Sequence, residues 1–163
     1  MLAVKSHEKG EALAMREKFS SELKVAIKGG EKRRVGTIRM IMAALKDKEI
    51  EARGQGKTVS DEDILALLQK MTKSRKESQE IYEKAGRVDL ATQESEEIAI
   101  IQGFLPQQLS EAEVAQAIAA AIAETKASSV KDMGKVVGAL KGKYPGRIDF
   151  AKASALVKRM LAG

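Results

Sequence analysis

The chain of 163 residues contains no cysteine, which excludes disulfides, thiolate metal sites and a cysteine nucleophile. Its single histidine is His7, so serine–histidine pairs and histidine-based metal sites are not expected either. No glycine-rich motif that cradles phosphates is present. The sequence therefore predicts no catalytic constellation, no cofactor and no metal site in this chain.

Aromatic residues are scarce, at 3% of a chain that is 44% hydrophobic. The core must then be built from Ala, Leu, Ile, Val and Met, a composition that favours helix-on-helix packing over a sheet. No run of about 18 apolar residues occurs, so no membrane-spanning segment is expected.

Residues 1–14 lack the apolar centre of a signal peptide, and the first convincing helical pattern begins at Met15. We expect residues 1–14 to be a disordered extension ahead of the native start, and the protein to be cytoplasmic.

Helical periodicity without strand-like alternation predicts an all-α fold. The pattern places four helices in an N-terminal domain, residues 15–104, with Ile27 and Ile81 among the residues that face its core. Pro106 disfavours helix at the residue before it, which marks a domain boundary. Ser110 and Glu113 have the spacing of a capping box and begin a small three-helix C-terminal domain, residues 110–163.

Charge is divided unevenly along the chain. Residues 127–163 carry eight basic and two acidic residues, a net charge of +6, which is the net charge of the whole protein. Residues 1–126 carry 21 basic and 21 acidic residues and are neutral. A neutral body with a basic tail indicates a polyanionic partner, of which RNA and DNA are the usual ones.

Inside this tail, Met133, Val136 and Leu140 define one apolar helical face, and a stripe of glycines lies on another: Gly134, Gly138 and Gly142. Helix-interior glycine costs about 1 kcal/mol relative to alanine, so the stripe calls for a reason. One interpretation is that a phosphate backbone approaches it, flanked by Lys135 and Lys141. The other is that a neighbouring helix packs closely against it.

Other polar groups are open to two interpretations. Five carboxylates suggest either a paired-carboxylate site or, with more support, a solvated helix face: Glu77, Glu80, Glu83, Glu94 and Glu97. Residues 72–80 are polar nearly all round and either extend beyond the core or carry a function. A second basic cluster lies at Lys32, Arg33, Arg34, Arg39 and Lys46. Within it, Arg39 lies between two apolar residues, so we expect it to be half-buried; it either pairs with an acid from another helix, which is an architectural role, or has a functional role.

Several stretches resemble a known family. The patterns of residues 32–46, 75–90 and 104–110 resemble YqeY-like proteins of the GatB/YqeY family. Asp132-Met-Gly-Lys-Val-Val-Gly138, followed by Gly146-Arg-x-Asp149, is similar to the C-terminal tail of the GatB subunit of the tRNA-dependent amidotransferase. The resemblance covers about residues 15–161.

The resemblance implies an all-helical fold and a tRNA-binding accessory module with tRNA or another structured RNA as partner. It also implies the label of carbon–nitrogen ligase with glutamine as amido-N-donor, although this chain resembles only the helical tail and is not expected to be catalytic alone. A tRNA-aminoacylation or amidotransferase protein is a second possible partner. The alternative functions are a protein–protein adaptor and an amidotransferase component. The positions implied to contact RNA are Lys131, Lys135, Lys141, Lys143, Arg147 and Lys158, with Gly134 and Gly138 allowing close approach.

Overall fold

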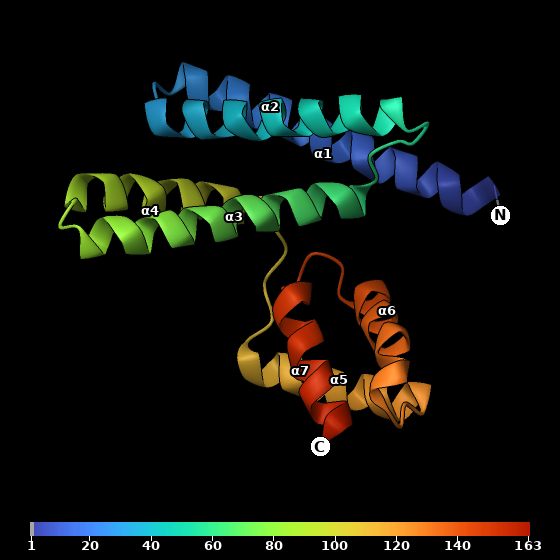
Figure 1. Cartoon of the computed structure of the whole chain (residues 1–163). Coiled ribbons are helices and arrows are strands. Elements are labelled where there is room, and N and C mark those ends of the chain that lie inside the picture. Colours follow the sequence, from blue (N-terminus) through green and yellow to red (C-terminus); the bar gives the residue numbers. More distant parts are fainter. Residues whose placement is uncertain (1) are drawn as a thin grey trace. The chain divides into compact units, whose positions relative to one another are not determined.

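The computed structural model describes the backbone of residues 2–163 and the side chains of residues 14–163. Within this part the chain is all-α, as the sequence predicts, with seven α-helices and one short 3-10 helix (Figure 1). The helices are α1 (Leu2–Lys28), α2 (Lys32–Gly54), α3 (Asp61–Lys84), α4 (Val88–Gln102), α5 (Glu111–Thr125), η1 (Val130–Asp132), α6 (Met133–Lys143) and α7 (Phe150–Ala162).

The helices form two groups, and the chain divides into two compact units. Unit 1 is Met1–Phe104 with α1–α4, and unit 2 is Leu105–Gly163 with α5–α7. That the ranges 15–104 and 110–163 are independent domains stays a prediction. The predicted disordered extension, residues 1–14, falls outside the described side chains except for Ala14, and it too stays a prediction.

Unit 1 is built from two helical hairpins, α1 with α2 and α3 with α4 (Figure 1). Each hairpin turns at a glycine with positive φ, Gly30 at +67° and Gly86 at +69°, a conformation that residues with a side chain rarely adopt. After Gly30, the Glu31 N–H donates to the Ala26 carbonyl at 3.0 Å, which satisfies a carbonyl left open at the end of α1.

Three helix starts are set by residues close by in the chain, and the start at Ser110 is the one predicted above. Ser60 begins α3 and Ser110 begins α5, each in a reciprocal capping box with the residue three positions on. Asp149 begins α7, where its carboxylate accepts from the Ala151 N–H at 3.0 Å. Because these signals are carried within four residues, the surrounding fold does not change them.

The core of unit 1 is aliphatic, with one aromatic pair. Phe19 of α1 and Phe104, which follows α4, pack edge to face with ring centroids 5.1 Å apart. The buried aliphatic residues from all four helices include Ala26, Ile38, Ile41, Leu45, Ile64, Leu68, Ile98 and Ile101. The prediction that Ile27 and Ile81 face this core is wrong, because they are 51% and 65% exposed near the ends of α1 and α3.

Unit 2 has its own hydrophobic core between α5, α6 and α7. The buried residues are Ala117, Ile118, Ala121, Val136, Leu140, Ile148, Ala153 and Val157. Residues 144–147 form a turn, in which the Arg147 N–H donates to the Tyr144 carbonyl at 3.2 Å. Among the described helices of both units, none combines the length and apolarity needed to cross a bilayer.

Candidate nucleic-acid interface

The open face of unit 2 is the glycine side of α6. Val136 and Leu140 are buried on the opposite side of this helix. A Cβ atom placed on Gly134, Gly138 or Gly142 would meet no atom within 4 Å. The prediction that a neighbouring helix packs against this stripe is therefore wrong for the described chain, and the glycines present bare backbone to the outside.

Lysines border this bare backbone on both sides. Lys135 and Lys141 are each three residues from Gly138, and a helix turns about 100° per residue, so they lie about 60° to either side of it. Both are exposed, as is Lys131 in the 3-10 helix that precedes α6. The result is a strip of uncovered helix backbone flanked by three ammonium groups.

Two of the lysines lie over aromatic rings. The Lys141 Nζ is 5.7 Å from the centre of the Phe150 ring, and the Lys143 Nζ is 5.7 Å from the centre of the Tyr144 ring. Such contacts favour a defined position of the ammonium group over free rotation. Lys158 is exposed on α7, next to the buried Val157.

Asp132 sets the start of this helical segment. Its carboxylate accepts from the Ser128 N–H at 3.0 Å, and its Oδ1 lies 3.9 Å from the Lys135 Nζ. The Ser128 backbone hydrogen bond, together with the Ser129 N–H and the Lys135 charge, holds the pKa of Asp132 below its ordinary value. The carboxylate therefore stays ionised at neutral pH and offsets part of the lysine charge nearby.

Arg147, the predicted RNA contact in the turn, is half-buried and already engaged. Its Nε donates to the Gln107 carbonyl at 2.9 Å, and its guanidinium lies 5.9 Å from the Tyr144 ring centre. The Leu109 N–H donates to the Arg147 carbonyl at 2.9 Å. Arg147 thus holds the segment before α5 against the turn before α7, a role that the sequence did not reveal.

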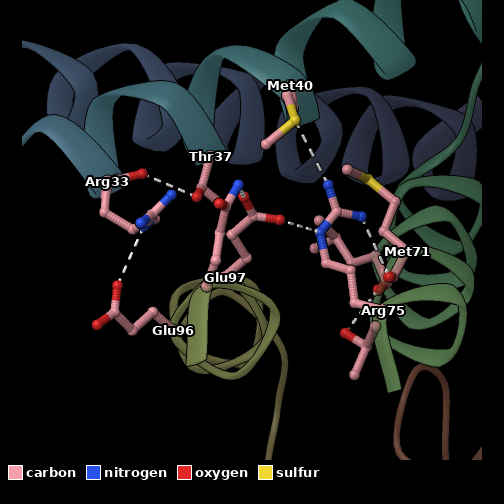
Figure 2. Close-up of polar contacts among 10 residues, drawn as sticks. Arg33, Thr37, Met40, Met71, Arg75, Glu96 and Glu97 are labelled. Atoms are coloured by element: carbon pink, nitrogen blue, oxygen red, sulfur yellow. Dashed lines mark hydrogen bonds and ion pairs between the residues drawn. The ribbon is translucent and has the colours of Figure 1, made fainter. Parts of the chain in front are cut away.

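A different polar centre lies inside unit 1 (Figure 2). The Arg75 Nε of α3 donates to the Glu97 Oε2 of α4 at 2.9 Å, and the two side chains are only 15% and 8% exposed. A second guanidinium nitrogen donates to the Met71 carbonyl at 3.2 Å, and the third lies 3.5 Å from the Met40 sulfur of α2. Within the polar stretch of residues 72–80, Arg75 thus packs on α4 through this pair, whereas Lys73, Lys76 and Glu80 are exposed.

The carboxylates expected on a solvated face divide into two groups. Glu77, Glu80 and Glu83 are exposed, as that interpretation requires. For Glu97 it is wrong, because this side chain is buried and its second oxygen accepts from the Gln93 amide at 3.3 Å. Burial, and the charge of Glu97, raise the pKa of the half-buried Glu94 above its ordinary value. Since Arg75 and Gln93 occupy both Glu97 oxygens, the pair has the character of a structural contact.

The expected burial of Arg39 is also wrong, because this side chain is exposed on α2. Its neighbours carry the ion pairs instead. Arg33 contacts Glu96 at 3.0 Å, and Arg34 contacts Glu22 at 2.8 Å. The side chains described for residues 14–163 contain no group of three or more acidic or histidine residues placed to hold a metal ion.

The chain is similar to known proteins over most of its length. A family model described as "Yqey-like protein" matches residues 16–161. A relative from Lachancea thermotolerans, named "altered inheritance of mitochondria protein 41, mitochondrial", is 36% identical over 113 residues, which cover 68% of this chain and 59% of the relative. A relative of the same name from Pyrenophora tritici-repentis is 29% identical over 132 residues, 77% of this chain and 71% of the relative. The first relative is thus matched over less than two thirds of its own length.

Proposed function

The chain belongs to the family of Yqey-like proteins, and from this premise we propose that unit 2 binds structured RNA, tRNA being the expected class. The single observation that carries the proposal is the open glycine strip of α6, bordered by exposed lysines. Phosphate groups contact proteins mostly through lysine, arginine and backbone groups, and a strip without side chains lets a sugar–phosphate chain come close.

The charge distribution supports the same proposal. Residues 127–163 carry the whole net charge of +6, while α1–α4 belong to the neutral part of the chain. Release of counterions makes such binding fall steeply with salt, by about 0.7 to 0.9 log units per phosphate contact for each log unit of salt. About five contacts would therefore give a slope of roughly −4.

Recognition of shape is expected to outweigh recognition of sequence. The aromatic rings of unit 2, Tyr144 and Phe150, are half-buried and lie beneath Lys143 and Lys141. They are poorly placed to stack on bases, which is how proteins usually read single-stranded RNA. Contacts to phosphates and to the form of the RNA helix would then provide most of the affinity.

The proposed role is that of an accessory module and not of a complete enzyme. The ligase label implied by the family resemblance, with glutamine as amido-N-donor, would then describe a protein that works with this chain. The names of the two relatives include the word mitochondrial, which describes those proteins. For this chain, the cytoplasmic location expected from the sequence stays a prediction.

The experiment is a titration of labelled total tRNA with the full chain, followed by fluorescence anisotropy at several salt concentrations. The test variant is Lys135→Glu with Lys141→Glu, which reverses both exposed charges beside Gly138. The matched control is Lys48→Glu with Lys70→Glu, which makes the same change in net charge at exposed positions of α2 and α3.

We expect the test variant to weaken tRNA binding by about tenfold or more and to flatten the salt dependence by roughly two contacts. The control variant should bind nearly as the unmodified chain does. Equal weakening in both variants would mean that only net charge matters. Unchanged binding in a folded test variant would remove α6 from the RNA surface.

A further inference from the structure

The outer face of α2 carries two parallel rows with a period of seven residues. One row is basic, and all its members are exposed: Lys32, Arg39, Lys46 and Arg53. The other is small or apolar and equally exposed: Gly36, Ala43 and Ile50. At 1.5 Å of rise per residue, successive members of each row are about 10.5 Å apart along the helix.

The cations of this row, called here the α2 basic row, are not used by the described part of the chain. Arg33, Arg34 and Arg16 each have a carboxylate partner within unit 1. No ion pair among the described residues includes a member of the α2 basic row. The first turn of α2 contains no acidic residue, so Lys32 stands at the positive end of the helix dipole, where a cation is unfavourable.

A groove runs beside these rows, between α1 and α2. Its volume is about 440 Å³, and its lining includes Phe19, Met42, Ala43 and Leu45. Lys46 lies at the same groove, as does the Arg16–Glu49 ion pair with its 2.7 Å contact. The volume lies in the range of about 300–1,000 Å³ that is typical of pockets for small ligands. An apolar hollow therefore adjoins the middle of the α2 basic row.

The seven-residue period points to a helix as the occupant. Rows with this period drift by only about 20° per repeat on an α-helix, so they stay aligned with a second helix that winds along them. Small residues such as Gly36 and Ala43 allow the two helix backbones to come close. The exposed Ile50, at 58%, offers an apolar contact that a phosphate chain would not use.

The charges decide which kind of helix fits. Two copies of this chain packed through the same face would bring their cations together, and like charges facing each other at an interface disfavour association. A partner with carboxylates at matching spacing would instead pair with each cation. We propose that the α2 basic row and the groove between α1 and α2 dock an acidic amphipathic helix of another protein, with its apolar side chains in the groove and its carboxylates on the lysines and arginines.

The test uses two labelled synthetic peptides of about three heptads, each with a leucine row and a glutamate row. Viewed from the N-terminus, the glutamate row lies clockwise of the leucine row in one peptide and counter-clockwise in the other. Parallel and antiparallel docking on α2 are therefore both tested. A third peptide has lysine in place of every glutamate. Each is titrated with the full chain and its anisotropy measured.

We expect one acidic peptide to bind and the lysine peptide not to bind. Arg39→Glu with Lys46→Glu should weaken the acidic peptide by about tenfold or more, because two attractions become repulsions. Ala43→Phe should weaken it as well by filling the groove, and since Ala43 is exposed the fold should tolerate the change. Lys48→Glu with Lys70→Glu serves again as the control of equal charge and should change peptide binding by less than about twofold.

Several results would overturn the proposal. The first is that neither acidic peptide binds at a concentration of about 1 mM. The second is that the Arg39→Glu/Lys46→Glu variant binds the acidic peptide as tightly as the unmodified chain does. A tenfold loss of tRNA affinity in that variant would make the row an RNA surface. Dimers in sedimentation that Ala43→Phe abolishes would make the face a contact between copies. The proposed RNA site lies on α6, so peptide binding and tRNA binding are tested on different helices. If no acidic peptide binds while tRNA still binds, the peptide proposal fails and the RNA proposal stands.

Discussion

Arg75 of α3 and Glu97 of α4 form a hydrogen-bonded ion pair, 2.9 Å between Nε and Oε2, in the interior of unit 1 (Figure 2). Both side chains are largely removed from water, and each charge is neutralised chiefly by the other. Removing one partner leaves a buried charge without compensation, whereas removing both leaves an apolar space that other side chains can fill. The pair therefore couples two helices whose other buried residues are mainly aliphatic, among them Leu68 of α3 and Ile98 of α4.

Replacing Arg75 by Met should lower the free energy of unfolding of unit 1 by about 3 kcal/mol or more. The double variant Arg75→Met with Glu97→Met should regain most of that loss, since no unpaired charge is left. Urea denaturation followed by circular dichroism measures both. Glu77→Gln, at an exposed carboxylate of α3, is the control and should change little. Additive losses in the double variant would show that the two charges do not act as a pair.

Gly138→Ala should raise the stability of unit 2 and weaken tRNA binding in the same molecule. The added methyl group meets no atom of the described chain, and alanine in a helix interior is favoured over glycine by about 1 kcal/mol. The methyl group would stand where the proposed sugar–phosphate contact lies. Thermal unfolding and tRNA anisotropy provide the two readouts.

Gly36→Ala is the matched control for this change. Gly36 also lies on an exposed helix face, on α2, with open space around its Cβ position. It should give a similar gain in stability without any effect on tRNA binding. If Gly138→Ala binds tRNA as the unmodified chain does, the bare strip is not a contact surface.

Glu94→Gln should stabilise unit 1 at neutral pH, and the gain should depend on pH. Burial and the charge of Glu97 raise the pKa of Glu94 in the folded chain, so ionisation of this group weakens the fold. The amide cannot ionise, so the variant gains stability above the folded-state pKa of Glu94. As the pH falls below about 4.3 the carboxyl is protonated in both states, and the gain disappears. Melting temperatures of both proteins between pH 3 and 8 test this; a gain that does not vary with pH would contradict it.

Sequence reasoning succeeded where the signal is local and failed where another helix decides the outcome. Ser60, Ser110 and Asp149 could be assigned as helix starts because each cap closes on a residue two or three positions away. Arg39 was expected to be half-buried because its neighbours are apolar, yet a helix turns about 100° between neighbours and places them on different faces, and Arg39 is exposed.

Glu97 was expected to be exposed and is buried, and the spacing of residues on α4 could have indicated this. Glu94 and Glu97 each precede by four residues an isoleucine of the core, Ile98 and Ile101, which puts both carboxylates on the buried face of α4. Grouping these two residues with the other acids as one solvated set overlooked their position on the buried face. That Arg75 would be the partner of Glu97 could not be read from α4 alone, because it depends on how α3 packs against it.

Asp149→Ala should lower the stability of unit 2 by about 1 kcal/mol. The carboxylate accepts from the N–H groups of Ala151 and Lys152 at 3.0 and 3.3 Å, and alanine would leave both donors without this partner. Asp149→Asn keeps an acceptor oxygen and should lose much less. Thermal unfolding of the two variants distinguishes the cap from a general effect of charge. An equal loss in both would assign the stability to the charge.

The contact between Phe19 and Phe104 constrains the order in which the chain can fold during its synthesis. Phe19 is made early, but the ring that covers it belongs to the last residue of unit 1. The aromatic part of this core can therefore close only after all four helices have left the ribosome. Residues 105–163 are made after this ring, which at about 5–20 residues per second takes on the order of 3 to 12 s, and part of that time passes before Phe104 leaves the ribosome. Helices α1–α4 can thus begin to assemble before the basic segment of the chain is complete.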